Sequence, residues 1–445
     1  MEMTPFCKIK GYCNFKYYGK YVLKNTIEKL YNCNIIIWNS TIEKFEKKYK
    51  VDISGNDKRF AYELNDNTMI IICRIKKSGD TICTIPFILH GTFLSLIKGY
   101  VWNQLGSTLT RVLSECYDKN FFGSQHMLGE YLVKKIIANT FSKRGFDTNN
   151  IFYLVEYLQK LSATTFEDEY FKTGFIISRS FYAYMKEGNN DRKGNIIPLT
   201  SGYALLHENV PEKRLWYLVD GEKSFLIFGK ELYIHHLFIR DVSDDSIPYF
   251  DTYSLSQTLL GQDVVFRVLS KNQYSVLNAD GLEFINIENR WKFRDYSVLI
   301  SYFKMYNRLN SEIINKIIYF VMHCSHENKS VIIWLPNDLE EIELNKYILS
   351  SNNIISENLD ILDIRADTLI KRMLTSDGVT AIDSYGKVIL TGGIVDLNSV
   401  SSKGKAMGTG ESAARILSRN GIAIKISQDG AIKLFKDPDE NPLLF

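Results

Sequence analysis

The spacing of apolar residues changes along the chain and divides it into segments of different character. Up to about residue 164, helical and strand patterns are mixed. Residues 166–300 carry runs of β-branched and aromatic residues that are broken by Gly, Asp and Asn, which is typical of strands and their turns. From residue 309 onward, helical and strand patterns alternate again. We therefore expect an α/β fold class, with a boundary near residue 300 and domains over 1–165, 166–300 and 301–445.

The first segment predicts a mixed α/β domain. Apolar residues at positions i, i+3 and i+4 indicate helices over 130–141 and 150–161. Two β-branched runs flank the turn Lys77-Ser78-Gly79-Asp80, so residues 67–89 are expected to form a hairpin. Further elements are expected nearer the start of the chain: helices over 21–31 and 41–50, and a buried strand over 32–39.

The C-terminal segment predicts a compact mixed α/β domain with a central sheet. Its first helix, over 309–324, has Asn310 or Ser311 as a candidate N-cap and leads into the strand 331–336. Gly421 is expected to end the last helix. The remaining elements are a helical pattern over 366–374, a hairpin of 379–383 and 388–395, and a hairpin of 422–427 and 431–435.

Composition excludes several classes of protein. The 54 Lys and Arg residues nearly balance the 51 Asp and Glu residues, so no global charge selects nucleic acid or an anionic membrane. The seven cysteines show no metal-binding spacing and no secretory signal precedes them, which indicates reduced thiols in a cytosol. The longest apolar runs are too short for a spanning helix. We expect a cytoplasmic protein that binds neither nucleic acid nor membrane.

The dipeptide Asp377-Gly378 is the first candidate for chemistry. It stands between a helical pattern and the strand 379–383. A carboxylate at the edge of a strand is placed to hold a divalent metal ion or to polarise a hydroxyl group. Asp-Gly is also a common turn dipeptide, so the alternative is that Asp377 only forms the turn.

The second candidate is the stretch GKAMGTGESAARILSRNG over 404–421, a glycine-bearing loop that enters a helix. The exposed N–H groups at such a helix start bind anions, and Gly408 and Gly410 let a phosphate approach the backbone. A plain loop with a capped helix is the alternative, and no Walker A motif is present. The candidate capping residues are Thr409, Glu411 and Ser412.

These two stretches together resemble the diadenylate cyclase domains, which join two ATP molecules into cyclic di-AMP. The resemblance covers about residues 305–436. TSDGVTAIDSYGKVILTGGIV is similar to the family's Asp-Gly-Ala segment and hairpin, with Asp377-Gly378-Val379 at the motif. GTGESAARILSRNGIAIKISQDGAIKLF is similar to the second segment, in which a Gly-Thr-Arg-His-Arg run opens a helix and a serine-bearing hairpin follows.

The chain departs from the family at the Arg-His-Arg positions, where it has Gly410-Glu411-Ser412. In the family the arginines hold triphosphate oxygens and the histidine helps at the metal. Losing two charge-assisted hydrogen bonds, worth ~1.5–3 kcal/mol each, weakens phosphate binding. Lys403 and Lys405 in the neighbouring loop could supply the lost charge, although lysines in a loop are commonly just solvated.

The resemblance implies a role for each candidate residue. Asp377 would bind Mg²⁺ or Mn²⁺ and assist deprotonation of a ribose 3′-hydroxyl group, and Glu411 would be a second metal ligand. Ser427 would line the nucleotide pocket. The residues expected to contact the nucleotide are Gly378, Gly408, Thr409, Gly410, Ser412, Lys403, Lys405 and Ser427.

Three functions follow from these expectations. The first is nucleotidyl transfer on ATP, which needs two domains face to face in a homo-oligomer, with residues 1–300 as a regulatory region that senses a signal or recruits a protein partner. The second is a catalytically degenerate domain that binds a nucleotide as a sensor. The third is a scaffold with a vestigial site.

Overall fold

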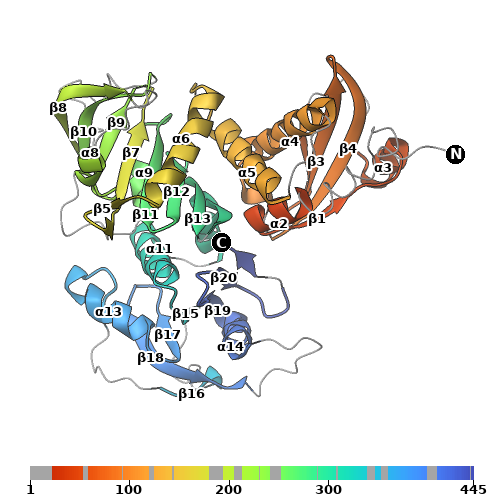
Figure 1. Ribbon diagram of the computed structural model, residues 1–445. Coiled ribbons are helices and arrows are strands. Elements are labelled where there is room, and N and C mark those ends of the chain that lie inside the picture. The colour runs from red at the N-terminus through yellow and green to blue at the C-terminus, as the bar shows by residue number, and fades with distance from the viewer. Residues whose placement is uncertain are drawn as a thin grey trace. The chain divides into compact units, whose positions relative to one another are not determined.

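The computed structural model of the protein resolves into two compact units (Figure 1). The first unit comprises Met1–Asp241 with Ser256–Asp295, and the second comprises Val242–Leu255 with Tyr296–Phe445. The structure describes residues 23–53, 59–92, 94–119, 125–142, 145–179, 194–204, 213–229, 231–240, 252–287, 289–306, 309–337, 346–351, 359–397, 408–440 and 442–445.

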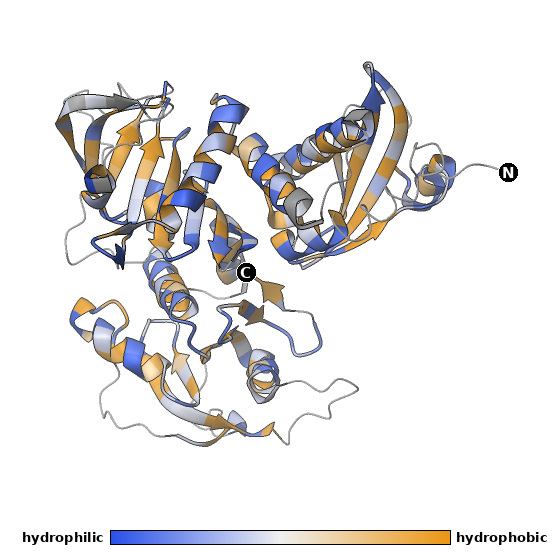
Figure 2. Ribbon diagram, viewed as in Figure 1, coloured by the Kyte–Doolittle hydropathy of each residue, from blue (hydrophilic) through white to orange (hydrophobic). Residues whose placement is uncertain are grey.

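An antiparallel sheet of order β1-β4-β3-β2 begins the first unit. Strand β3 is buried over most of its length because helices cover both of its faces, with α4 against Ile71 and Cys73 and α3 against Ile70 and Ile72. Figure 2 shows the hydrophobic residues along these strands. The elements are β1 (Asn34–Ile37), β2 (Ala61–Asn65), β3 (Thr68–Lys77), β4 (Asp80–His90), α2 (Lys24–Tyr31), α3 (Ile42–Tyr49), η3 (Leu94–Leu96) and α4 (Gly99–Lys119).

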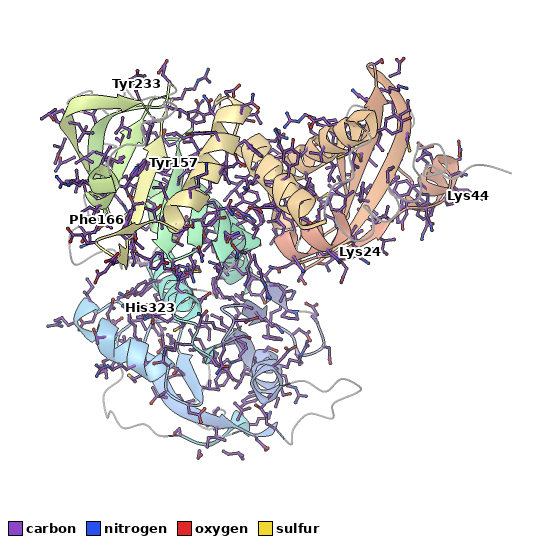
Figure 3. The ribbon with its side chains drawn as sticks, in the orientation of Figure 1. Lys24, Lys44, Tyr157, Phe166, Tyr233 and His323 are labelled. Carbon is purple, nitrogen blue, oxygen red and sulfur yellow. The ribbon has the colours of Figure 1, made fainter. Side chains whose placement is uncertain are left out.

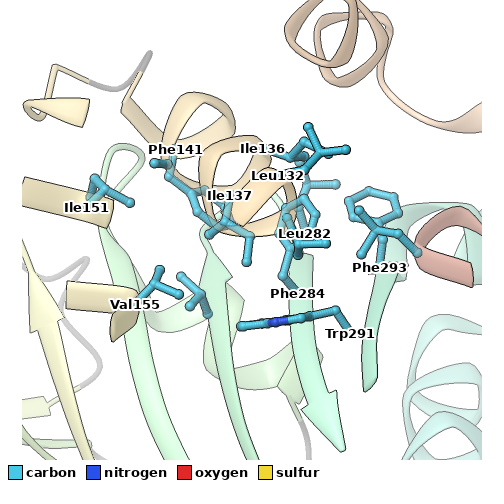
Figure 4. Packing of buried hydrophobic residues seen from close by; sticks show 14 of the residues in the cluster. Leu132, Ile136, Ile137, Phe141, Ile151, Val155, Leu282, Phe284, Trp291 and Phe293 are labelled. Carbon is cyan, nitrogen blue, oxygen red and sulfur yellow. The ribbon is translucent and has the colours of Figure 1, made fainter. Parts of the chain in front are cut away.

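A larger sheet of order β14-β13-β12-β11-β7-β9-β10-β8 completes the first unit, and β7 and β9 are its parallel pair. Helices α5 and α6 pack on it through residues such as Ile137 and Val155 (Figure 4). The elements are α5 (Gln125–Ser142), α6 (Thr148–Ser162), β7 (Thr173–Ile177), β8 (Gly194–Ala204), β9 (Ser224–Phe228), β10 (Tyr233–Arg240), β11 (Val264–Ser270), β12 (Gln273–Asn278), β13 (Leu282–Ile287) and β14 (Arg290–Asp295). Shorter elements are β5 (Thr165–Phe166), β6 (Glu169–Tyr170) and α8 (Lys213–Tyr217). The residues of α9 (Thr252–Thr258) are divided between the two units.

One hydrophobic core runs through both of these sheets. The Tyr31 ring of α2 packs 5.1 Å from the Phe293 ring of β14. Residues on both sides of position 165 therefore share a core, although their apolar patterns differ. Helices with an apolar period of 3.6 and strands with an apolar period of 2 both present an apolar face that can be buried.

The second unit is built around a seven-stranded sheet of order β16-β18-β17-β15-β19-β20-β21. Strands β15 and β17 are parallel, and the other neighbouring pairs of this sheet are antiparallel. The elements are α10 (Tyr296–Tyr306), α11 (Ser311–His326), β15 (Val331–Pro336), β16 (Ile348–Ser350), η4 (Ile364–Ala366), α13 (Asp367–Leu374), β17 (Val379–Ile382), β18 (Val388–Val395), α14 (Thr409–Leu417), η6 (Ser418–Asn420), β19 (Gly421–Ile426), β20 (Ile432–Phe435) and β21 (Leu443–Leu444).

Helices cover both faces of this sheet. Helix α14 packs on the face that carries Trp334 and Ala423. Because successive strand residues point to opposite faces, Ile333 and Ile424 face away from α14, and both are fully buried. Helix α13 contacts β15, β17 and β18, and Figure 1 shows α13 and α14 on either side of the strands. The expected mixed α/β class with a central sheet is confirmed.

Several predicted elements are confirmed in detail. Asn310 is the N-cap of α11, since its side-chain Oδ1 accepts a hydrogen bond of 2.8 Å from the Ile313 amide. Both predicted C-terminal hairpins form, as β17–β18 and β19–β20. In the first unit, Ser78 and Gly79 take positive φ angles of 52° and 96° and form the tight turn expected between β3 and β4.

Two expectations about α14 are wrong. No side chain caps the helix: Gly408 is the N-cap, and Thr409, Glu411 and Ser412 lie inside the first turn. Gly421 does not end α14 either, because the 3₁₀ turn η6 separates them and Gly421 is the first residue of β19. Within the described residues, none of the helices is both long and apolar enough to cross a membrane.

Candidate functional site

The two candidate stretches meet at one pocket of about 680 Å³ in the second unit. We call it the α14 pocket. Its wall is formed by residues of strands β15, β17, β18, β19 and β20 and of the start of α14. These elements are labelled in Figure 1. The residues that line it are Ser330, Ile332, Asp377, Gly378, Val379, Gly392, Gly393, Ile394, Val395, Leu397, Gly408, Thr409, Gly410, Glu411, Ala413, Lys425, Ser427 and Lys433.

Asp377 and Gly378 reach the pocket through a tight turn. Gly378 has a φ of +99°, and a Cβ at this position would lie 2.7 Å from the carbonyl carbon of Gly392, so only glycine fits. The Asp377 Oδ1 atom accepts a 3.0 Å hydrogen bond from the Gly378 amide, and the Asp377 side chain is exposed. Asp377 therefore forms the turn and at the same time presents a carboxylate to the pocket.

The start of α14 forms another part of the wall. Gly408 and Thr409 are exposed and line the pocket, and no side chain caps the helix. The first N–H groups of a helix carry a partial positive charge and point outward, which favours a bound anion. This end of α14 suits a phosphate group better than it suits a cation.

Glu411 is held by two cationic side chains. The Lys433 Nζ atom lies 2.7 Å from Oε2, and the Arg415 Nη2 atom lies 3.5 Å from Oε1. Burial alone would raise the pKa of Glu411, but the hydrogen bond and charge of Lys433, together with Arg415, outweigh burial and hold that pKa below its ordinary value. A carboxylate neutralised in this way is a poor partner for a divalent cation, so these contacts fit a positioning role for Glu411 better than the expected metal role.

The ion pairs of Glu411 predict a pH-dependent stability. Because folding lowers the pKa of Glu411, its ion pairs stabilise the fold above the ordinary pKa of 4.5. This stabilisation is lost as the pH falls through the lowered pKa of the folded state. The free energy of unfolding of Glu411→Gln should therefore lie furthest below that of the wild type above pH 4.5, and the gap should shrink in acid. Chemical denaturation between pH 3 and pH 7 measures it. A gap that is constant with pH contradicts the ion pairs.

Lys425 and Lys433 are pocket residues that sequence reasoning missed. The Lys425 Nζ atom donates a 2.6 Å hydrogen bond to Ser330 Oγ, and burial lowers the pKa of Lys425. Each lysine interrupts a strand that is otherwise mainly apolar: Lys425 lies in IAIKIS and Lys433 in AIKLF. Register across the predicted hairpin was the signal that could have found them, since it places the two residues on one face.

The other predicted residues fall into two groups. Ser427 lines the pocket at the end of β19, as Gly410 does at the start of α14. Ser412 is not among the lining residues, and its hydroxyl donates a 3.3 Å hydrogen bond to the Gly408 carbonyl oxygen. Lys403 and Lys405 lie outside the described residues.

Metal-binding side chains do not cluster in the part of the chain that the structure describes. No group of three or more His, Cys, Asp or Glu side chains gathers there. His323 lies on α11 (Figure 3) and is not among the residues that line the α14 pocket, and burial lowers its pKa.

No family model and no curated protein matches the chain. Among solved structures, it is similar to a hypothetical membrane-spanning protein from Bacillus cereus, with 14% identity and a TM-score of 0.27 over 33% of this chain and 69% of the other. It is also similar to a double mutant of DacA from Staphylococcus aureus, with 16% identity and a TM-score of 0.25 over 30% of this chain and 87% of the other. At such TM-scores neither structure establishes the fold or function of this chain.

Proposed function

We propose that the second unit binds ATP or a related nucleotide in the α14 pocket and joins two such nucleotides in a diadenylate cyclase-like reaction. Each ribose 3′-oxygen would attack the α-phosphorus of the other nucleotide, and the bond from that phosphorus to the departing pyrophosphate would break. The observation that supports this proposal is that the two stretches that resemble diadenylate cyclase domains line one pocket. Asp377 and Gly378 line the same pocket as Gly408, Thr409 and Ser427, although 30 residues of sequence or more separate the two groups.

The size and the wall of the pocket suit a nucleotide. A volume of about 680 Å³ lies within the range of ~300–1,000 Å³ that is usual for small-molecule sites. Apolar side chains such as Ile394 and Leu397, which are 55% and 40% exposed, offer a surface for a base. The start of α14 offers its N–H groups to phosphate oxygens.

Asp377 is the proposed catalytic residue. Its carboxylate would accept the proton of a ribose 3′-hydroxyl group or hold Mg²⁺ or Mn²⁺ together with oxygens of the nucleotide. A bound divalent ion would supply a Lewis acid that polarises a phosphoryl oxygen. Since two nucleotides must meet, the active form would be a homo-oligomer with two α14 pockets face to face.

A second candidate function is a nucleotide-binding sensor without chemistry. The observation that favours it is the state of Glu411, whose carboxylate is neutralised by Lys433 and Arg415 at the position where the family has a histidine. In that case residues 1–300 would carry the signal to a protein partner, and the α14 pocket would only report occupancy.

One experiment separates these functions. The full chain is incubated with ATP, and then with mixed nucleoside triphosphates, in the presence of Mg²⁺ or Mn²⁺, and the nucleotides are identified by mass spectrometry. A cyclic or linear dinucleotide supports the reaction. Unchanged ATP that binds by calorimetry supports the sensor. Absence of both product and binding overturns the proposed function.

A further inference from the structure

Two lysines face each other across the β19–β20 hairpin, which forms part of the wall of the α14 pocket. Lys425 of β19 and Lys433 of β20 are direct cross-strand partners, and both line the pocket. Like charges directly opposite each other destabilise a hairpin. An apolar pair would stabilise the hairpin more. The two lysines are therefore unfavourable for the stability of the hairpin unless an anionic group lies beside them.

The carboxylate nearby does not balance these charges. Glu411 already faces two cations, Lys433 and Arg415, and Lys425 donates to the neutral Ser330 hydroxyl. Beside the start of α14, the pocket wall therefore carries the two lysines and one carboxylate, Glu411, which Arg415 contacts from outside the lining. The other charged lining residue, Asp377, lies at the other motif, before β17. The excess positive charge lies beside the helix start of α14, which also favours an anion.

The missing side chain at Gly410 makes room for Lys425. A Cβ at Gly410 would lie 2.9 Å from the Lys425 Cε atom and 3.2 Å from its Nζ atom. The ammonium group therefore lies over the first turn of α14, where a larger residue at position 410 would displace it. Gly410 also stands at the first of the Arg-His-Arg positions, where the diadenylate cyclase domains that this sequence resembles have an arginine.

We propose that Lys425 and Lys433 bind the phosphate oxygens of the nucleotide, so that the positive charge comes from the β19–β20 hairpin instead of from the start of α14. Glu411 is then a positioning residue that holds Lys433 toward the pocket. This inference rests on the proposed function, because it assigns the phosphate-binding groups of that same site. Ammonium groups bind phosphate as point charges, so the specificity for a particular phosphate geometry is lower than with paired guanidinium groups.

The test compares Lys425→Met and Lys433→Met with the wild type by calorimetry on the full chain. Methionine keeps an unbranched apolar stem and removes the charge. Each variant should bind ATP about 10- to 100-fold more weakly, as expected for the loss of one charge-assisted hydrogen bond. Binding of adenosine, which has no phosphate, should not change. Lys387→Met is the matched control, since Lys387 pairs with Asp360 at 3.0 Å and is not a pocket residue.

Each outcome decides between the two proposals. If the wild type binds ATP and both variants bind it as tightly as the Lys387→Met control, the inference fails and the proposed function stands. If inorganic tripolyphosphate binds with the same lysine dependence and ATP binds no more tightly, the lysines are phosphate ligands and the nucleotide assignment fails. Thermal unfolding of each variant confirms that the fold is intact. Gly410→Arg on the Lys425→Met background should recover part of the ATP affinity, and no recovery would count against Lys425 as the replacement for the arginine.

Discussion

Replacing Asp377 by asparagine is expected to lower the rate of dinucleotide formation by about 10²- to 10⁴-fold, the range that a general base contributes. Asparagine retains the Oδ1 atom that accepts the Gly378 amide hydrogen bond of 3.0 Å, so the turn should survive. Only the negative charge is lost, and with it the proton acceptor and the proposed metal ligand. The measurement is the initial rate of product formation from ATP by mass spectrometry, at saturating Mg²⁺ or Mn²⁺.

Asp383→Asn is the matched control for this experiment. Asp383 also sits in a turn of the second unit, where its Oδ1 atom accepts the amides of Tyr385 and Lys387 at 2.9 and 2.7 Å, but it is not a pocket residue. Its substitution should leave the rate within about twofold of the wild type. A wild-type rate in Asp377→Asn would remove Asp377 from the chemistry. In a pure sensor, the same variant should change only the metal-dependent part of ATP binding.

Gly421→Ala is expected to destabilise the second unit by about 3 kcal/mol, because two costs combine. Gly421 has a φ of +128°, in a region that essentially only glycine adopts and that costs another residue ~1–3 kcal/mol. In addition, the new Cβ would overlap the carbonyl oxygen of Leu335 on the neighbouring strand β15, and overpacking of this kind costs ~1–3 kcal/mol. The strands β15 and β19 would have to separate at this point of the sheet.

Hydrogen exchange followed by mass spectrometry measures this effect on peptides that contain β15 and β19. Their amides should exchange faster in Gly421→Ala, and the thermal unfolding of the second unit should move to a lower temperature. Gly408→Ala is the control, since Gly408 has a φ of −64° and nothing within 4 Å of the added Cβ, and it should cost under ~1 kcal/mol. Equal protection in both variants would show that the backbone at Gly421 adapts.

Local patterns predicted most of the second unit because each element there carries its own signal. The hairpin β17–β18 follows from its β-branched runs and the turn that Asp383 and Gly386 form, and α11 follows from its apolar period and from Asn310. The capping of α14 could not be predicted in this way. Thr409 and Ser412 are good capping residues, but the N-cap position falls on Gly408, one residue before Thr409, so both lie inside the first turn.

The pocket was predictable in part. Residue type was enough to identify Asp377, Gly408 and Gly410 as candidates, because tight turns and close approaches to a ligand need glycine. Lys425 and Lys433 do not, since their importance depends on strand register and on a helix packed over the sheet. The partners of Glu411 are hidden for the same reason, as Lys433 lies 22 residues away in sequence.

The order of the strands in the second unit has a consequence for synthesis of the chain. Strand β15 is buried at all six of its residues and lies between β17 and β19, which begin at Val379 and Gly421. A ribosome therefore releases the hydrophobic segment VIIWLP well before either neighbour exists. During that interval the nascent chain exposes an apolar strand without charged residues, which favours aggregation until its neighbours pair with it. Chaperone demand should therefore be greatest for chains arrested between β15 and β19.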